Sequence, residues 1–394
     1  MFLALSLAGV IASIGYYIGS SLSARRFAIR AETPPPPTPA VSPRVVLLKP
    51  LYNLSDAILS NLETFLAVDH PGFELVLGVP GSEIDAAGRL AELRARFPQH
   101  HISLVTAEEP GCANRKVARL IQMLEHAPDA DVYVLSDADI RVEPDYLRRL
   151  LHELTSEKGV GVVTCAYRAR PVGKLASRFE ALMINTDFAP MVILAEAVEP
   201  VRQAFGATIA FKREVLSAIG GFRLLRDMLA DDFFLGRHAI DHGFEIRLSS
   251  ALVTIACDDN RFIDFWNHQL RWARTYRTAR PLSIATIVTH GPFMGLLFVL
   301  ASHASPASLA MLAIVLGTRL LTAVYTLRRV LRLPDLMGNL ILLPVKDIVM
   351  TAIWFTSLCG NQVLWGGRRF RIMPGGSMRE IEAQRGGRMR EIEG

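Results

Sequence analysis

The sequence predicts an α/β domain with a mostly parallel sheet, joined to transmembrane helices at both its N-terminal and its C-terminal end. Two observations lead to this prediction. Between residues 43 and 280, strand-length apolar runs alternate with segments of helical spacing, an order typical of a parallel sheet with helices on both faces. Outside that range the chain is strongly apolar: apolar residues make up 51% of the whole and charged residues only 21%, below the usual quarter.

The N-terminal segment predicts a membrane anchor. Residues 2–22 carry no charge over roughly the length that crosses a bilayer. Arg25 and Arg26 follow at once, whereas a cleaved signal peptide carries its basic residues in front of its apolar run. We therefore expect an anchor over residues 1–24 whose C-terminal end lies in the cytosol, as the positive-inside rule requires. The alternative is a buried core helix.

A proline-rich linker and then the α/β domain are expected next. Residues 25–42 include the run ETPPPPTPA, which favours an extended, semi-rigid spacer. The domain itself is expected in the cytosol, over residues 43–280. Its expected strands are residues 44–50, 74–79, 101–106 and 131–137. Its expected helices are residues 55–68, 86–97, 113–127 and 144–154.

Residues 281–360 are expected to return the chain to the membrane. The apolar segments 282–302 and 307–327 predict a membrane hairpin. A third candidate, 339–359, carries a lysine and an aspartate at its middle, where charges are costly, so an interfacial or re-entrant segment is expected there. Residues 361–394 predict a basic tail that is cytosolic or disordered. The net charge of +5 is modest and no long Lys/Arg tract is present, so nucleic acid is not an expected partner.

Two acids follow the fourth expected strand. Asp137 and Asp139 come directly after VYVLS, at the edge of the sheet where ligands bind in such folds. Acids at i and i+2 can converge on one cation, and Mg²⁺ bound by one or two carboxylates commonly takes further ligands from phosphates. The pattern therefore indicates a metal bound to a diphosphate. On its own it also fits a plain loop, or a helix cap at Asp139.

Two further patterns suggest chemistry. Asp231 and Asp232 precede an apolar helical stretch, which fits a general base at Asp232, but also a pair of acids favoured by the helix dipole. In HQLRWARTYR, arginines recur at every third position from Arg271, so one helical stripe is cationic, with Trp272 beside it. That face could hold a diphosphate or an acceptor; the alternative is a basic helix that meets anionic headgroups.

Taken together, the three patterns are far more specific than any one. Their order resembles the membrane-bound glycosyltransferases of the GT-A fold, and the chain is most similar to the ceramide glucosyltransferase family, in particular its bacterial branch associated with hopanoid biosynthesis. The resemblance covers nearly the whole chain except the linker and the last residues. It is carried by VVLLKPLY (45–52), ANRKVARL (113–120), VLSDADIRVEPDYL (134–147), FGATIAFKRE (205–214), GGFRLLRDMLADDFFLG (220–236) and HQLRWARTYR (268–277).

The resemblance implies roles for individual residues. Asp137 and Asp139 would coordinate a divalent cation, Mg²⁺ or Mn²⁺, together with the diphosphate of the nucleotide sugar. The residues expected to line the nucleotide pocket are Lys49, Pro50, Asn114, Lys116 and Asp137.

The catalytic residues that the resemblance implies are Asp232, Arg271 and Trp272. Asp232 would act as the general base, and the Arg-Trp pair would close the site over diphosphate and acceptor. The sequence departs from the family's signature at His268, which stands where glutamine or arginine is preferred.

The resemblance also implies a function: inverting transfer of a sugar from a UDP-sugar to a hydroxyl of a membrane lipid, with N-acetylglucosamine and bacteriohopanetetrol as the expected pair. Ceramide or diacylglycerol glucosylation is the alternative, followed by a processive polysaccharide synthase or a non-catalytic membrane scaffold. The implied location is the cell inner membrane, with several crossings and the lipid bilayer as a partner. Residues 178–205, apolar but interrupted by acids, would admit the lipid; ordinary core helices are the alternative.

Overall fold

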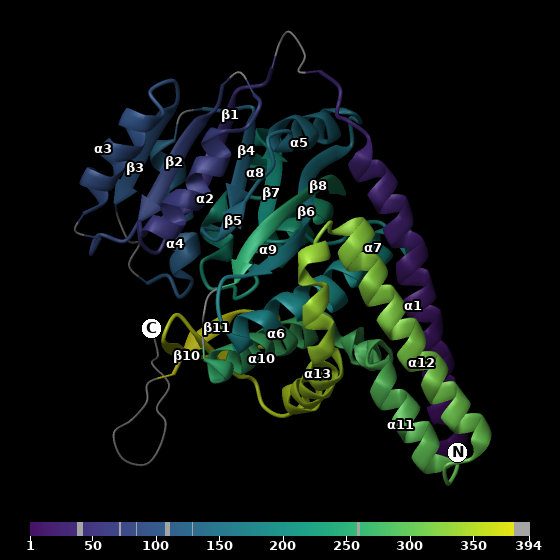
Figure 1. Cartoon of the computed structure of the whole chain (residues 1–394). Coiled ribbons are helices and arrows are strands. Elements are labelled where there is room, and N and C mark those ends of the chain that lie inside the picture. The colour runs from purple at the N-terminus through teal and green to yellow at the C-terminus, as the bar shows by residue number, and fades with distance from the viewer. Residues whose placement is uncertain are drawn as a thin grey trace.

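A computed structural model describes residues 1–37, 42–70, 72–83, 85–106, 111–127, 129–257 and 261–381. Part of the expected linker, residues 38–41, and the end of the expected tail, residues 382–394, lie outside the described residues. Figure 1 shows an α/β domain from which the long helix α1 and the pair α11 and α12 extend together.

The domain is built on an eight-stranded sheet with the order β3-β2-β1-β4-β7-β6-β8-β5. The strands are β1 (Val45–Pro50), β2 (Glu74–Val79), β3 (His101–Thr106), β4 (Val132–Ser136), β5 (Ile140–Arg141), β6 (Val160–Pro171), β7 (Thr208–Lys212) and β8 (Glu245–Cys257). Strands β3, β2, β1 and β4 are parallel, and so are β6 and β8; β7 is antiparallel to both of its neighbours, and β5 to β8. The predicted fold class is confirmed.

Helices cover both faces of this sheet. They include α2 (Asp56–Leu66), α3 (Ala86–Arg96), α4 (Arg115–His126), α5 (Tyr146–Thr155), α8 (Arg213–Ala218) and α9 (Asp231–Asp241). Strand β1 is buried along its whole length, as a central parallel strand should be. Because side chains alternate along a strand, Leu47 joins the core that contains Phe65 of α2, while Leu48 joins the one that contains Leu120 of α4.

Helix α1 (Phe2–Glu32) is longer than the expected anchor. It continues through residues 25–32, which the sequence analysis assigned to the linker. The reason is packing, because Ala24, Phe27 and Ala28 are buried in the main core of the domain. The helix ends where the prolines begin, at residue 34, since proline cannot continue the hydrogen-bond ladder of a helix. One continuous helix therefore serves both as the candidate membrane segment and as a wall of the domain.

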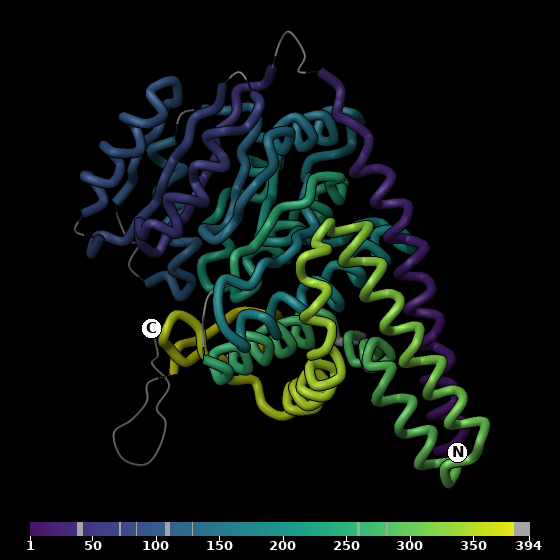
Figure 2. Tube along the Cα trace, in the orientation of Figure 1, coloured from purple at the N-terminus to yellow at the C-terminus, as the bar shows by residue number. Residues whose placement is uncertain are grey.

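The C-terminal apolar region follows α10 (Phe262–Ala279). Its elements are η3 (Pro281–Thr289), α11 (Gly291–Ala301), α12 (Pro306–Tyr325) with the π-helical turn η4 (Thr326–Val330), η5 (Pro334–Leu342) and α13 (Leu343–Leu358). The expected segment 282–302 is not one straight helix, because η3 and α11 meet at an angle of 78°. Among the described residues, four helices are long and apolar enough to cross a membrane, or five if this bent pair is one span. Figure 2 shows α11 and α12 running alongside the N-terminal part of α1.

Another candidate span lies inside the domain. The continuous helix formed by α6 (Leu175–Met183), the π-helical turn η1 (Ile184–Phe188) and α7 (Ala189–Val198) passes the same test of length and composition. More than half of its apolar stretch is nevertheless buried within the protein, so it packs as a core helix over much of its length.

Residues 361–381 are ordered, so the disordered alternative does not hold for them, while a cytosolic location stays a prediction. They form an antiparallel sheet of β9 (Gln362–Trp365), β10 (Arg368–Ile372) and β11 (Met378–Glu380). Val363, Phe370 and Ile372 bury one face of this sheet against Leu229, just before α9. The turn between the first two strands has positive φ at both of its glycines, the geometry that a two-residue hairpin requires.

Candidate active site

The candidate site lies at the carboxyl end of β4. The start of α4, the start of α9, the residues before β7 and one face of α10 all converge on it, although they are far apart in the chain. Lys116 is its central side chain: its Nζ lies 2.8 Å from Oδ1 of Asp137 and 3.1 Å from Oδ2 of Asp231. Burial alone would lower the pKa of Lys116, but the neighbouring carboxylates of Asp137, Asp231 and Asp232 outweigh it and raise the pKa. Lys116 is therefore a fixed positive charge among three acids.

The carboxylates of Asp137 and Asp232 both lie close to Gly206. A Cβ atom built on Gly206 would lie 3.2 Å from Oδ2 of Asp137 and 3.3 Å from Oδ2 of Asp232, so both carboxylates border the space that a side chain at this position would take. The backbone N–H groups of Gly206 and Phe233 each donate to Asp232, both at 2.8 Å. These bonds aim the carboxylate across the site.

Burial, reinforced by the charge of Asp231, raises the pKa of Asp232 to about 6. Lys116 and the two backbone N–H groups act in the opposite direction. A carboxylate with a pKa near the working pH suits proton transfer. Asp231 and Asp232 are the first two residues of α9, after the N-cap Ala230, so they also lie where the helix dipole favours acids.

Two buried polar residues, Asn114 and Lys49, hold the segments that carry these acids in place. Asn114 caps α4, accepting from the N–H groups of Lys116 and Val117, and its own amide donates to Met228 O and, at 3.3 Å, to Asp231. The expected nucleotide residue Asn114 thus acts as a brace that joins the starts of α4 and α9.

Lys49 is fully buried at the end of β1. Its ammonium donates to Ser136 and to the backbone carbonyl of Asp137, and lies 3.9 Å from the centre of the Phe65 ring. Burial lowers its pKa to about 7, against the pull of Asp139 and Asp137. Its neighbour Pro50 ends the strand and is buried. Lys49 therefore positions the backbone that carries the paired acids.

The paired acids Asp137 and Asp139 lie in the turn between β4 and β5. Carboxylate oxygens are ligands that Mg²⁺ and Mn²⁺ accept, so the donor set fits a divalent cation. In the part of the chain that the structure describes, no group of three or more His, Cys, Asp and Glu side chains is arranged to hold a metal. A cation bound here would thus need further ligands from a diphosphate or from water.

Helix α10 contributes the basic and aromatic side of the site. Burial lowers the pKa of Arg271 to about 10, opposed most strongly by Asp232 and then by Glu180, so the guanidinium remains charged at neutral pH. The Trp272 ring lies 5.9 Å from Phe188 and 5.0 Å from His268. Arg271 also lies 6.0 Å from the ring of Trp365 on β9, so the C-terminal sheet contributes to this side of the site.

The sequence analysis missed several contributors. Gly206 carries no chemical group that a motif search would notice. Glu180 of α6 binds Nδ1 of His268, which explains the unusual residue in the arginine-tryptophan motif as one partner of an acid–imidazole pair. Tyr167 stacks on Phe188 at 4.3 Å, and burial together with Asp232, Asp137 and Asp139 raises its pKa. The signals for these three lie in tertiary contacts rather than in local pattern.

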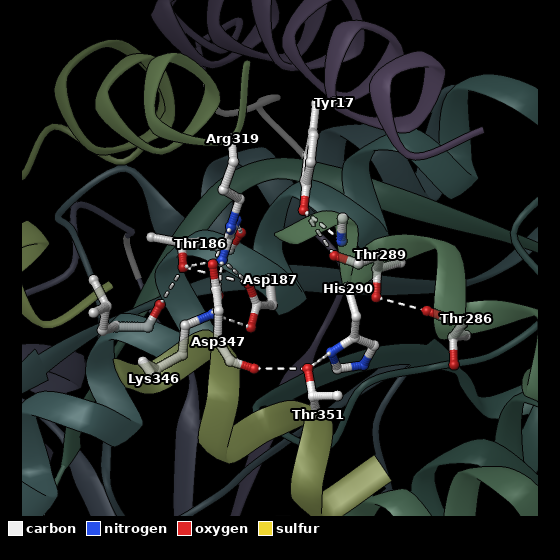
Figure 3. A network of polar contacts seen from close by, with 12 residues as sticks. Tyr17, Thr186, Asp187, Thr286, Thr289, His290, Arg319, Lys346, Asp347 and Thr351 are labelled. Atoms are coloured by element: carbon white, nitrogen blue, oxygen red, sulfur yellow. Dashed lines mark hydrogen bonds and ion pairs between the residues drawn. The ribbon is translucent and has the colours of Figure 1, made fainter. Parts of the chain in front are cut away.

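Figure 3 shows a buried network of polar contacts around Arg319. Arg319 of α12 makes two hydrogen bonds to Asp347 of α13, at 2.9 and 3.1 Å, and one to Asp187 of η1 at 2.5 Å. Lys346 lies 2.6 Å from Asp187 and 2.5 Å from Asp347. Two cations and two anions thus neutralise one another, which removes the electrostatic objection to charges within an apolar segment.

This ionic tetrad ties the apolar helices to the site. Asp187 is followed directly by Phe188, whose ring contacts Tyr167, Trp272 and Phe205. Arg319 also donates to the backbone carbonyl of Thr186, in the π-helical turn, at 2.8 Å. The position of Phe188 therefore depends on ion pairs formed with α12 and α13.

The fold agrees with solved structures. The mannosyltransferase PcManGT from Pyrobaculum calidifontis, solved in complex with GDP-Man and Mn²⁺, aligns with 91% of this chain and 99% of its own, at 20% identity and a TM-score of 0.54. This likeness shows that the domain has a fold of the GT-A type.

More particularly, the chain belongs to Glycosyl transferase family 21, whose model matches residues 5–378. Its relatives include two proteins of Caenorhabditis elegans: ceramide glucosyltransferase 1, 23% identical over 61% of this chain, and ceramide glucosyltransferase 3, 21% identical over 53%. The chain spans about half the length of these relatives, 50% and 45% respectively. Membership of the ceramide glucosyltransferase family is confirmed, and the narrower hopanoid branch stays a prediction.

Proposed function

We propose that the protein transfers one sugar from a UDP-sugar to a hydroxyl of a membrane lipid, with inversion at the anomeric carbon. The observation that supports this proposal best is that the carboxylates of Asp137 and Asp232 border the same small space beside Gly206. A donor held through its diphosphate near Asp137 would present its sugar toward Asp232. The candidate membrane helices, packed against the same domain, fit a lipid acceptor.

The reaction is a single displacement. Asp232 takes the proton of the acceptor hydroxyl, the acceptor oxygen bonds to the anomeric carbon, and the bond from that carbon to the diphosphate breaks. The nucleoside diphosphate leaves with the electron pair of that bond. Because attack and departure occur on opposite faces of the carbon, the configuration inverts. No second carboxylate is required as a nucleophile.

Positive charge around the leaving group has two protein sources. Lys116 lies beside Asp137, and Arg271 approaches from α10, still charged at neutral pH. Preorganised charges of this kind act where negative charge develops in the transition state. When bound, a divalent cation on Asp137 and Asp139 would supply further charge neutralisation to the diphosphate. Trp272 closes the acceptor side together with Phe188.

The acceptor that we propose is bacteriohopanetetrol, with N-acetylglucosamine as the sugar; ceramide and diacylglycerol with glucose are the alternatives. Support comes from the resemblance to the hopanoid branch and from relatives that are ceramide glucosyltransferases. We place the protein in the inner membrane with its catalytic domain in the cytosol, since Arg25 and Arg26 follow the apolar part of α1.

Reconstitution tests the proposal. The purified full chain in nanodiscs is given UDP-N-acetylglucosamine or UDP-glucose with each of the three lipids, and products are read by mass spectrometry. We expect one sugar per lipid, loss of product with EDTA and recovery with Mg²⁺ or Mn²⁺. Products with many sugars would indicate a processive synthase instead. No product with any pair, together with unchanged lipids in a deletion strain, would contradict the proposal.

A further inference from the structure

Two arginines of α10 bind the C-terminal end of α13. Arg274 donates to the backbone carbonyl of Cys359 at 2.6 Å. Arg277 donates to the carbonyls of Leu358, at 2.9 Å, and Gly360, at 2.7 Å. The last carbonyls of a helix lack partners within it and carry partial negative charge, so cations are favoured there. These bonds fix the chain as it leaves α13, and β9 then packs against α10.

The first arginine of the same stripe is not used in this way. Arg271 lies one turn before Arg274, on the same face of α10. In the part of the chain that the structure describes, its guanidinium makes no hydrogen bond and no ion pair, and none of its nitrogens is sealed from solvent. Its N–H groups are therefore open to a ligand. A phosphate suits them, because it can accept two parallel hydrogen bonds from one guanidinium.

The ring of Trp365, on β9, lies beside this guanidinium, with 6.0 Å between Cζ of Arg271 and the ring centre. A cation over an aromatic face at this distance is attracted by the ring. Trp365 is itself held in place, because it is partly buried against the cluster that contains Val363 and Phe370, and its ring lies 6.3 Å from that of Phe370. The tryptophan thus gives Arg271 a fixed wall without using up its N–H groups.

The sheet that carries Trp365 is also attached to the start of α4. Nη2 of Arg368, on β10, donates to the backbone carbonyl of Ala113 at 3.1 Å, and Nη1 donates to Glu380 of β11 at 2.6 Å. Ala113 is followed by Asn114, the cap of α4. Arg368 therefore ties the C-terminal sheet to the segment that carries Lys116.

A third attachment reaches the start of α9. The N–H of Met378, on β11, donates to the carbonyl of Asp227 at 2.7 Å, and the N–H of Leu229 donates to the carbonyl of Gly376 at 3.4 Å. Leu229 also belongs to the core of the sheet. The two acids that begin α9 follow within three residues. The C-terminal sheet thus contacts all three helices that bring charged side chains to the site.

We propose that the C-terminal sheet belongs to the active site, with Trp365 as the positioning residue for Arg271. The ring holds the guanidinium on the side of the site where the diphosphate of the donor binds, and Arg368 keeps this wall aligned with the start of α4. The inference rests on the proposed function, which assigns Arg271 to the leaving group. It makes donor binding depend on β9 and β10, which lie outside residues 43–280, where the sequence analysis placed the catalytic domain.

A double-mutant cycle on UDP binding tests this role. The full chain in nanodiscs is titrated calorimetrically with UDP and Mg²⁺, as the native chain, Trp365→Ala, Arg271→Ala and the double variant. We expect Trp365→Ala to weaken UDP binding at least about fivefold in the native background, but less than about twofold once Arg271 is gone, because the ring then has nothing to position. Losses that multiply in the double variant would overturn the proposal, and so would a native chain that binds no UDP.

Two further variants separate positioning from stability. Trp365→Phe keeps an aromatic face and should bind UDP within about twofold of the native chain. Leu364→Ala changes the neighbouring residue of β9, which is 43% exposed and points to the other face of the sheet, so UDP binding and melting temperature should both stay native. If Trp365→Phe binds as weakly as Trp365→Ala, or if Leu364→Ala is equally impaired, Trp365 acts through the packing of the sheet and not on Arg271.

The cycle also distinguishes the positioning role from the proposed reaction. UDP binding needs no acceptor lipid, so it reports on Trp365 even where no lipid is glycosylated. Coupling between Trp365 and Arg271 without sugar transfer to any lipid would leave the positioning role standing and remove the proposed function. Sugar transfer with independent effects of the two substitutions would leave the function standing and remove the positioning role.

Discussion

Nζ of Lys116 lies 2.8 Å from Oδ1 of Asp137, so the start of α4 supplies a positive charge to the acid that ends β4. The same ammonium serves Asp231 at 3.1 Å. The positive charge of Lys116 offsets the repulsion among the neighbouring carboxylates, and it lowers the pKa of Asp232.

Removing that charge should move the pH dependence of the reaction. Lys116 lowers the pKa of Asp232, so Lys116→Met should raise that pKa above its native value of about 6. Since the base must be ionised to act, the acid limb of the kcat/KM profile should shift to higher pH. Lys158→Met, at an exposed lysine, should leave the limb in place. If the acid limb of the kcat/KM profile stays at the same pH in Lys116→Met, Lys116 does not influence the pKa of Asp232.

Asp232 itself should be needed for turnover but not for donor binding. In the native chain kcat/KM should fall as pH drops below about 6, because protonation removes the base. Asp232→Asn should lower kcat by at least about a hundredfold, the usual contribution of a general base, while UDP binding by calorimetry is retained. Asp241→Asn, at the exposed end of the same helix, serves as the control. Native turnover in Asp232→Asn would remove the residue from the mechanism.

Gly206→Ala should damage the site through a single methyl group. The new Cβ would lie 3.2 Å from Asp137, 3.3 Å from Asp232 and 3.5 Å from Lys116, tighter than ordinary van der Waals contact for the first two. We expect kcat/KM to fall at least tenfold, with little change in melting temperature. Gly81→Ala, where a Cβ meets nothing within 4 Å, is the matched control. Equal kinetics in the two variants would show that the gap at Gly206 has no role.

Breaking the ionic tetrad should destabilise the protein, and removing a whole pair should restore it. Lys346→Met leaves two carboxylates facing one arginine, and unpairing a buried charge typically costs about 3–5 kcal/mol. The double variant Asp187→Asn with Lys346→Met keeps the Arg319–Asp347 pair and stays neutral. Thermal unfolding in detergent should show a large loss in the single variant and much of it recovered in the double. Additive losses would indicate that the two residues are not coupled.

Local pattern predicted much of this molecule. Alternating strands and helices were sufficient to place the acids after β4, because a buried strand such as VYVLS is recognisable from its own residues. The sequence also indicated the helix that carries Arg271 and Trp272. No local pattern predicted that Lys116 pairs with acids from two different elements. Only the folded chain brings α4, the end of β4 and α9 together.

Other predictions were limited for physical reasons. Lys346 and Asp347 led to the prediction of an interfacial or re-entrant segment, which stays a prediction; their partners Arg319 and Asp187 lie 27 or more positions away in sequence, so no local rule could pair them. The tail was predicted to be cytosolic or disordered, although its Gly366–Gly367 pair is a hairpin signal that could have been found. The apolar residues of these short strands form a core only when they pack against Leu229, which lies far away in the sequence.

The continuity of α1 sets the geometry of catalysis. A rod of 31 residues is about 46 Å long, roughly half as long again as the hydrocarbon thickness it would cross. Because the C-terminal end of α1 packs into the core of the domain, no flexible linker joins the domain to the membrane segment, and the domain is held at a fixed position relative to this helix. The proposed base would then work at a constant height above the lipid surface. That fixed height would decide which of several hydroxyl groups on the acceptor lipid reaches the base, and so which one receives the sugar.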